Sequence, residues 1–337
     1  MVGGAIHTRP RRAGPAPQRA RHLVSKSGGG GPPLLSRSSS SSTANPPRRL
    51  GITKQGRVAC LTNFRETGQA PIEGARSRGA IVNAYLRTPA SSAETTAQAA
   101  ARLIADGVAG VGGFSLLLGH LRRRGEDDDG LAVVSNRCTD VGGVQWLLRG
   151  GAAEAETHAL SNSFYGDRSW RKVVEAEGAV AAAVKALVAE RAGPDDVVQA
   201  CLRVLSADTL PRQRPGESWE VYLNQLRNSI FVPLVGLGSK SLIGESATPS
   251  DSTPRSASPA VGQGAKSAAA MVNGVVGGDH HATDATSGTY GTQKQSVILV
   301  DNEGKVTFFE RTLFDMNGSP IKLGEGDRKF EFQIEGW

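Results

Sequence analysis

Cysteine and histidine are the residue types most often used as nucleophiles and metal ligands, and this chain has three cysteines and six histidines. Cys60, Cys138 and Cys201 form no CxxC pair and have no short spacing. An odd, scattered set argues against a disulfide framework or a zinc site and favours a reducing compartment. We expect Cys60 within a strand and Cys201 in a helix stripe, where a free thiol packs as a small hydrophobic group.

Two further clusters are weaker candidates for chemistry. The histidine pair at 280–281 has aspartates close by and could bind a metal, but its surroundings are typical of a solvated linker. The glycines of 110–113 lack the strand and helix that flank a nucleotide-binding loop. The sequence therefore predicts neither a metal nor a nucleotide site.

The elements that must position functional residues begin with strands. Strands are predicted over Arg57–Asn63, Gly113–Gly119 and Leu131–Ser135, from their β-branched and apolar character. Two helices are predicted among them, over Gly79–Arg87 and Ala93–Asp106.

A block of helices follows. Apolar residues at helical spacing from 170 to 188 predict a long helix, with Asp167 or Ser169 as its cap. The pair at 193–194, Gly-Pro, ends this helix and begins the next. A third helix is predicted over Ser218–Ser229.

The chain returns to strands at its C-terminal end. Gln293–Val300 and Lys305–Arg311 flank the turn Asp301–Gly304, which predicts a hairpin, and Arg328–Glu335 predicts a last strand. Ala159–Asn162 is predicted to end another strand before the helices. The order of strands, helices and strands favours an α+β fold of layered antiparallel sheets over a doubly wound parallel sheet.

Two segments differ in composition from the rest. Residues 1–49 are basic and rich in Arg, Ser, Pro and Gly, and residues 239–288 are rich in Ser, Thr, Ala and Gly. Both are predicted to be disordered, because they bury too little apolar surface to offset their ordering entropy. We predict 1–49 as a low-complexity tail and 50–337 as a single domain, with 239–288 an insertion.

The net charge of +7 lies in the tail. Residues 1–49 carry nine basic and no acidic side chains, so the rest has a net charge of −2. The predicted domain therefore has no excess of basic charge for binding nucleic acid. No apolar run reaches the roughly 18–20 residues that span a bilayer, and no transmembrane segment is expected.

Several segments, in order, resemble the NRDE-motif family, the homologues of Transport and Golgi organisation protein 2. The matching segments are Leu50–Glu66 with its Leu-Thr-Asn-Phe, Ser77–Gly79, Gly112–Leu116, Ser135–Arg137, Leu160–Asn162, Trp170–Lys172, Tyr290–Thr292, Val297–Val300 and Thr307–Arg311. Each segment is short, but the ordered series covers about two-thirds of the chain, and its residues resemble those of fungal-type members in particular.

The chain departs from the family before Leu50. Members begin with Met-Cys, continue into Asn-Arg-Asp-Glu and reach Trp-Leu-Gly, and nothing here resembles these motifs. We expect either a gene-model start that replaced the natural one, or a transit-type segment that would direct the protein to mitochondria.

The resemblance implies the αββα sandwich of N-terminal-nucleophile hydrolases, incomplete at its N-terminus. In those enzymes the first residue attacks an amide, its α-amine acts as base, and asparagines stabilise the oxyanion. The implied candidate pocket consists of Asn63, Arg78, Asn162, Ser163 and Thr292. An asparagine after a strand is also a common turn residue. With Val2 after Met1 the chain supplies no such nucleophile, and no catalytic residue is assigned.

The resemblance also implies function. The first hypothesis is a non-enzymatic protein of Golgi organisation and secretion that handles haem or another small, lipid-like ligand, in the cytoplasm or peripherally on the Golgi. His120 and His158 are candidate haem ligands, although a lone histidine is more often structural. The second hypothesis is an N-terminal-nucleophile-type amidohydrolase whose nucleophile is absent from this gene model. The third is a protein that binds an anionic partner through residues 1–49.

Overall fold

The computed structural model describes most of the predicted domain and two short segments before it. The described residues are 3–7, 21–27, 49–63, 78–106, 108, 111–122, 130–147, 156–236, 289–315 and 317–337. The predicted insertion at 239–288 lies outside them, as do the histidines at 280–281.

The larger sheet has six antiparallel strands drawn from both ends of the chain. Its order is β13-β12-β11-β2-β1-β8. The strands are β1 (Gly3–His7), β2 (Arg21–Ser27), β8 (Thr157–Leu160), β11 (Lys294–Val300), β12 (Lys305–Thr312) and β13 (Asp327–Gln333).

The second sheet has five antiparallel strands in the order β3-β4-β5-β6-β7. They are β3 (Leu50–Ile52), β4 (Arg57–Asn63), β5 (Phe114–His120), β6 (Leu131–Ser135) and β7 (Gln145–Leu147). A two-stranded ribbon pairs β9 (Val235–Gly236) with β10 (Thr289–Tyr290), at the two flanks of the undescribed 237–288.

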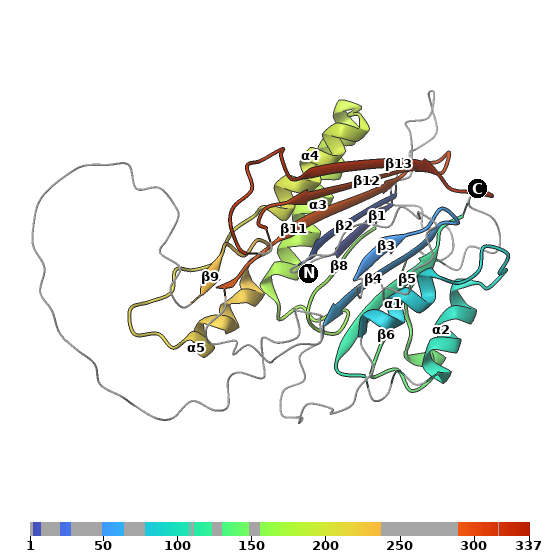
Figure 1. The fold of residues 1–337 in the computed structure, drawn as a ribbon, viewed down its shortest axis with the longest axis horizontal. Coiled ribbons are helices and arrows are strands. Elements are labelled where there is room, and N and C mark those ends of the chain that lie inside the picture. Colours follow the sequence, from blue (N-terminus) through green and yellow to red (C-terminus); the bar gives the residue numbers. More distant parts are fainter. Residues whose placement is uncertain are drawn as a thin grey trace, which may run out of the picture.

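The sheets stack face to face between two layers of helices (Figure 1). Helices α1 (Arg78–Leu86) and α2 (Thr96–Ala105) pack on the five-stranded sheet, and α3 (Arg171–Glu190) and α4 (Pro194–Leu205) pack on the six-stranded one. Helix α5 (Trp219–Leu223) continues as the 3₁₀ turn η2 (Asn224–Asn228), and a shorter turn, η1 (Val141–Gly143), precedes β7. This order of layers confirms the predicted α+β class with antiparallel sheets flanked by helices.

Side-chain alternation explains why the central strands are apolar on both faces. In β4, Val58 and Cys60 face the other sheet, while Ala59 and Leu61 pack under α1 and α2. Across the interface Ile298 and Val300 complete the core between the sheets. A strand that is covered on both faces has no solvent side, so β4, β5 and β11 appear as nearly continuous apolar runs.

The structure differs from the prediction for residues 1–49. Within this segment Gly3–His7 and Arg21–Ser27 are strands, and they lie in the interior of the six-stranded sheet, between β11 and β8. The prediction of disorder was wrong for these two stretches, because composition cannot reveal that partner strands distant in sequence satisfy their backbone groups. The rest of 1–48 lies outside the described residues.

Two local predictions also need correction. Neither Asp167 nor Ser169 caps α3, because the N-cap is Trp170 and no side chain bonds to it as a cap. The third helix is not continuous over Ser218–Ser229 but tightens into 3₁₀ geometry from Asn224. Such tightening is common at helix ends.

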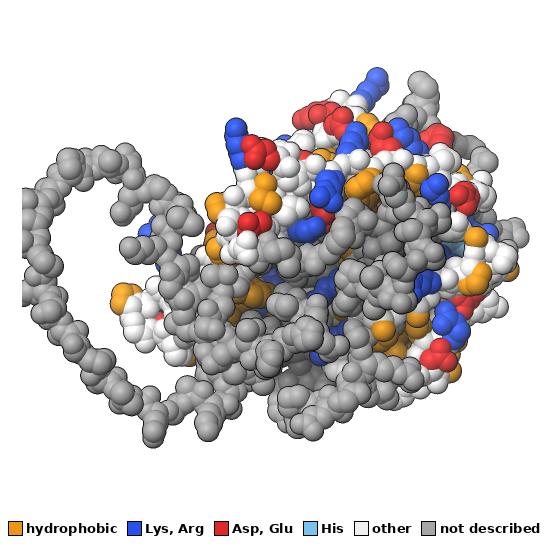
Figure 2. Space-filling model, viewed as in Figure 1, with side chains coloured by type: hydrophobic (Ala, Val, Ile, Leu, Met, Phe, Trp, Pro, Cys, Tyr) orange, Lys and Arg blue, Asp and Glu red, His pale blue; other side chains and the backbone are white. Residues whose placement is uncertain are grey.

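Basic and acidic side chains are interspersed on the described part of the face shown in Figure 2. On β13, for example, Lys329 lies 2.8 Å from Asp195 and 3.6 Å from Glu331. Among the described helices, none is both long and apolar enough to cross a membrane.

Candidate functional site

Two of the predicted pocket residues meet where the sheets end. Asn63 is the last residue of β4, and Asn162 follows β8 by two residues. The Nδ2 of Asn162 donates to the backbone carbonyl of Asn63 at 3.0 Å. The two asparagines, 99 residues apart in sequence, therefore join the ends of the two sheets.

Ser163 lies in the same loop. Its carbonyl accepts a hydrogen bond of 3.1 Å from the hydroxyl of buried Ser115 on β5, and its own hydroxyl donates to the carboxylate of Asp167. Although burial raises the pKa of Asp167, hydrogen bonds from Ser163 and Ser169 hold it below its usual value. The loop is thus fixed by an ionised carboxylate.

Arg78 reaches the same end of the five-stranded sheet. Its Nε donates to the carbonyl of Gly112 at 3.0 Å, two residues before β5 begins. A Cβ at Gly112 would lie 2.3 Å from Arg78 Nη2, so the glycine leaves room for the guanidinium. Burial and the charge of Arg78 lower the pKa of Arg49, while Tyr290 raises it, which places these three side chains near one another.

Thr292 is engaged elsewhere. It is fully buried, its hydroxyl accepts from the backbone N–H of Val232 at 2.9 Å, and its own N–H donates to the carbonyl of Val232 at 2.8 Å. Thr292 therefore anchors the segment before β11 to the chain after η2. A pocket shared by all five predicted residues remains a prediction.

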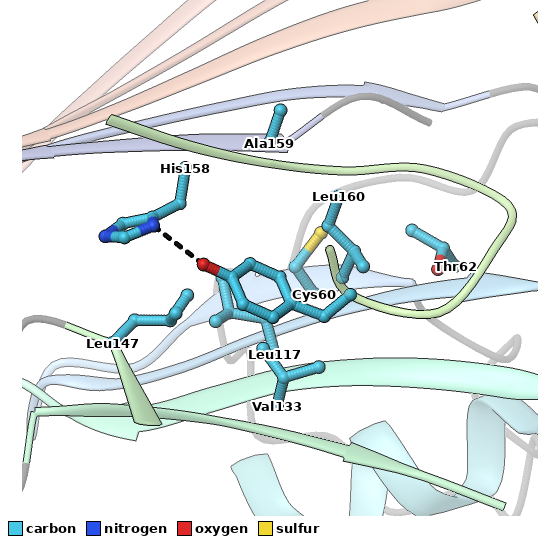
Figure 3. A pocket seen from close by; sticks show the side chains of 9 residues that line it. Cys60, Thr62, Leu117, Val133, Leu147, His158, Ala159 and Leu160 are labelled. Carbon is cyan, nitrogen blue, oxygen red and sulfur yellow. Dashed lines mark hydrogen bonds between the residues drawn. The ribbon is translucent and has the colours of Figure 1, made fainter. Parts of the chain in front are cut away.

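A small cavity opens between the two sheets, next to this loop (Figure 3). Its walls are mostly apolar, and it has room for about one water molecule. It is lined by Cys60, Thr62, Leu117, Val133, Leu147, His158, Ala159, Leu160 and Tyr165. Of these, Cys60 and His158 are the two that are candidates for chemistry from the sequence alone.

Three polar side chains form a chain at the edge of the cavity. The Tyr165 hydroxyl lies 2.8 Å from Nδ1 of His158, whose Nε2 lies 3.0 Å from the Glu156 carboxylate. Burial, then Glu177 and Glu156, raise the pKa of Tyr165, so the phenol stays protonated near neutral pH. No sequence pattern predicts this arrangement, because Tyr165 comes from the loop after the strand that carries His158.

Neither candidate haem ligand has a ring arranged for haem. Both ring nitrogens of His158 contact Tyr165 and Glu156, as described above. Nε2 of His120 lies 2.8 Å from the carbonyl of Gln55, and Arg122 approaches its Nδ1 at 3.4 Å. An axial bond to iron would break these contacts, so the two histidines do not fit a haem site.

The three cysteines are buried, and none forms a disulfide with a described residue. Burial raises the pKa of the Cys201 thiol to about 12, which keeps it protonated. The residues that the structure describes contain no group of three or more Cys, His, Asp or Glu able to hold a metal ion.

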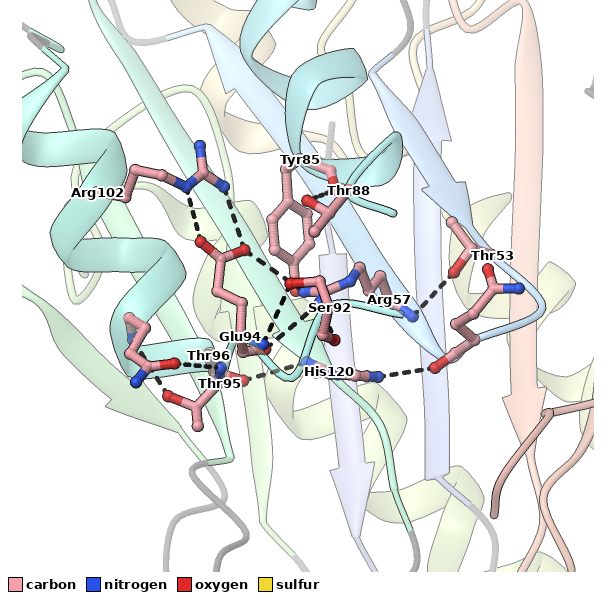
Figure 4. A network of polar contacts seen from close by, with 12 residues as sticks. Thr53, Arg57, Tyr85, Thr88, Ser92, Glu94, Thr95, Thr96, Arg102 and His120 are labelled. Carbon is pink, nitrogen blue, oxygen red and sulfur yellow. Dashed lines mark hydrogen bonds and ion pairs between the residues drawn. The ribbon is translucent and has the colours of Figure 1, made fainter. Parts of the chain in front are cut away.

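A second polar cluster lies at the opposite end of the five-stranded sheet (Figure 4). Arg57 is 2% exposed, lies over the Tyr85 ring at 5.6 Å and donates to the carbonyls of Ser92 and Glu94. The Glu94 carboxylate accepts from Arg102 at 2.7 Å. These contacts tie α1 and α2 to β4, which gives the cluster a structural role.

The protein is a layered α+β protein: two antiparallel sheets stack between helical layers, and a hydrogen bond between Asn63 and Asn162 joins them at one end. The family model described as Transport and Golgi organisation 2 matches residues 49–315, which is most of the chain. The protein belongs to this family, and the resemblance found in its sequence is confirmed. No curated protein matches the chain.

Proposed function

We propose that the protein acts in Golgi organisation and protein secretion without catalysing a reaction, and that it does so by binding a small, lipid-like ligand. The family's description supports the cellular role. The observation that carries ligand binding is the apolar space between the sheets with polar groups at its edge. It has room for about one water molecule in this structure, so the sheets must part there to admit an apolar molecule with a polar end.

The state of the thiols supports a non-enzymatic role. A thiol attacks as thiolate, and burial keeps Cys201 protonated. Cys60 lies mid-strand in β4 and is 2% exposed, so its backbone nitrogen belongs to the sheet. We place the protein in the cytoplasm or peripherally on the Golgi, where cell fractionation would locate it.

The cellular role is tested by deleting the gene in the native host and measuring secreted protein and Golgi morphology. Wild-type protein should restore both. Asn162→Ala, which removes the bond to Asn63, should restore them poorly, whereas the exposed control Asn317→Ala should restore them fully. Normal secretion and Golgi structure in the deletion strain would refute the proposal.

Ligand binding is tested with a fluorescent fatty acid and the purified full chain. Leu160→Trp should fill the cavity and weaken binding at least tenfold, while Leu323→Trp, at a 70% exposed position, should not. Equal binding by both variants would exclude the cavity as the ligand site.

One observation favours the amidohydrolase as a second candidate. Gly3 of β1 pairs with Leu160, so β1 begins beside Asn162. In N-terminal-nucleophile hydrolases the nucleophile precedes such a strand, and asparagines stabilise the oxyanion. N-terminal sequencing of the native protein decides this, since a mature Cys followed by Asn-Arg-Asp-Glu would support the enzyme and the start as written would not.

A further inference from the structure

Helix α3 begins without a side-chain cap. Its N-cap, Trp170, makes no cap hydrogen bond, and no acidic residue lies in the first turn. The N–H of Val173 bonds to the carbonyl of Trp170 at 2.9 Å, but those of Arg171 and Lys172 precede the first helical carbonyl that could accept them. Among the described residues no side chain caps these N–H groups, and the end of this 20-residue helix carries a partial positive charge.

A buried lysine points at this helix end. The side chain of Lys172 is 4% exposed, and its ammonium lies 5.0 Å from the centroid of the Trp170 ring. Within the described part of the chain this ammonium forms no ion pair. A cation beside the positive end of a helix is electrostatically unfavourable, so an anion here would stabilise both.

A second buried polar group directly follows β8, the strand that packs against α3. Ser161 is 2% exposed, and its hydroxyl has no hydrogen-bond partner among the described residues. Along β8, Ala159 packs against Val173 of α3, whereas Leu160 faces the other sheet. Continuing the alternation one residue further places Ser161 on the α3 side.

The carboxylates beside this helix end are already engaged. Glu177 of α3 accepts hydrogen bonds from the N–H of Ala159 and from Arg168. Asp167, in the loop before the helix, accepts hydrogen bonds from Ser163 and from both the N–H and the hydroxyl of Ser169. Burial is what lowers the pKa of Lys172, to about 8. The other charged or titratable residues on described elements packed against α3 are His7 on β1, His158 on β8, Asp195, Asp196, Cys201 and Arg203 on α4, and Arg227 in η2.

We propose that the N-terminus of α3 is an oxyanion-binding site, in which Lys172, Ser161 and the first N–H groups of the helix hold a carboxylate or phosphate group. The Lys172 ammonium and the helix N–H groups are donors and the Ser161 hydroxyl can donate, which is what an anion in a buried place requires. The identity of the natural ligand, the anionic end of a lipid-like molecule, rests on the proposed function, whereas the site itself does not.

Exposed cations surround the site and supply a matched control. Arg171 pairs with Glu175 at 2.5 Å and Arg168 with Glu177 at 2.8 Å, and each arginine is more than 60% exposed. Their charges are partly neutralised and screened by water. Arg171→Ala therefore removes one positive charge from the same turn without removing the buried anchor.

The test is calorimetric titration of the purified full chain at pH 7 with inorganic phosphate and, separately, with octanoate. Lys172→Met, of similar volume but uncharged, should weaken binding at least tenfold, and Arg171→Ala by less than threefold. In the wild type, affinity should fall as pH rises through about 8, where Lys172 loses its proton. This arm needs no variant.

The two anions separate the sources of the ligand. Tighter binding of octanoate supports a fatty carboxylate, and tighter binding of phosphate supports a phosphorylated ligand. Lys172→Met binding as tightly as wild type, affinity unchanged between pH 7 and 9.5, or no binding of either anion would overturn the site. Each result is independent of the secretion assay, so the site and the proposed function can fail separately.

Discussion

Burial of the charged Lys172 ammonium destabilises the folded protein, so replacing this lysine with a neutral residue should raise the free energy of unfolding. The folded-state pKa of Lys172, about 8, lies below the ordinary 10.5, so the charged form is destabilised below pH 8 and the cost fades as pH rises to 10.5. At 1.36 kcal/mol per pKa unit the upper bound is on the order of 3 kcal/mol. Lys172→Met should be more stable than wild type by up to this amount at pH 7 in urea unfolding.

The stability gain should shrink between pH 8 and 10.5, as the wild-type lysine becomes neutral. Arg171→Ala, the exposed control, should change stability by less than about 0.5 kcal/mol. A Lys172→Met protein that unfolds more easily at pH 7 would mean that the ammonium has a stabilising partner.

His120 should make stability sensitive to acid. Burial, then the charge of Arg122, lower its folded-state pKa, and Nε2 lies within hydrogen-bonding distance of the Gln55 carbonyl. Because the folded pKa lies below the unfolded value near 6.5, stability is fully present above that pH and is lost as pH falls through it. Urea midpoints between pH 7.5 and 5 should fall less for His120→Gln than for wild type, and parallel curves would contradict this role.

For individual residues, the sequence predicted which residue types stand at the ends of strands more easily than which residues they contact. The asparagines at strand ends could be named, because both follow apolar runs, and the structure joins them by a hydrogen bond. Lys172 could not be singled out, since lysine is usually exposed and its burial is apparent only in the folded structure. Thr292 was predicted for its place before a strand, yet its partner, Val232, lies 60 residues earlier.

Among the elements, the turn between β3 and β4 depends on one glycine. Gly56 has a φ of +84°, and a Cβ there would lie 2.3 Å from the backbone oxygen of Leu121. Gly56→Ala should therefore destabilise the fold by about 1–3 kcal/mol. Gly178→Ala on an exposed turn of α3, where no atom lies within 4 Å, should instead stabilise it by about 0.5–1 kcal/mol. Similar denaturation midpoints for the two variants would contradict this account.

Elements were predictable where local signals agree. The strand Arg57–Asn63 and the hairpin around Asp301–Gly304 were predicted correctly, and Gly304 has the φ of +81° that such a turn favours. The cap of α3 was not, because Asp167 and Ser169 bond to each other rather than to the helix. Local sequence offers several capping residues, and tertiary contacts decide among them.

For the whole molecule, the layers followed from the order of strands and helices, but the strand order did not. The six-stranded sheet pairs β1 with β8, about 150 residues later in the chain, and β2 with β11, about 270 residues later. The low-complexity composition around β1 and β2 masks their strand character in the sequence, and pairing with strands so distant in the chain leaves no local pattern. The Arg-rich segment, interpreted from sequence as a tail, therefore supplies interior strands.

Deleting residues 1–27 should consequently disrupt the fold. All seven residues of β2 pair with β11, and β1 joins β2 to β8, so the deletion leaves β11 unpaired along one edge and β8 without a partner in the described sheet. Unpaired backbone groups in the sheet interior and the lost contacts with α3 and α4 should abolish a cooperative transition in urea. Deleting 250–275 is the control, since the flanking strands β9 and β10 pair with each other and closure of a long loop depends weakly on its length. A 1–27 deletion variant that unfolds cooperatively at the wild-type midpoint would show that the sheet does not need these strands. That result would favour the hypothesis that residues 1–49 bind an anionic partner.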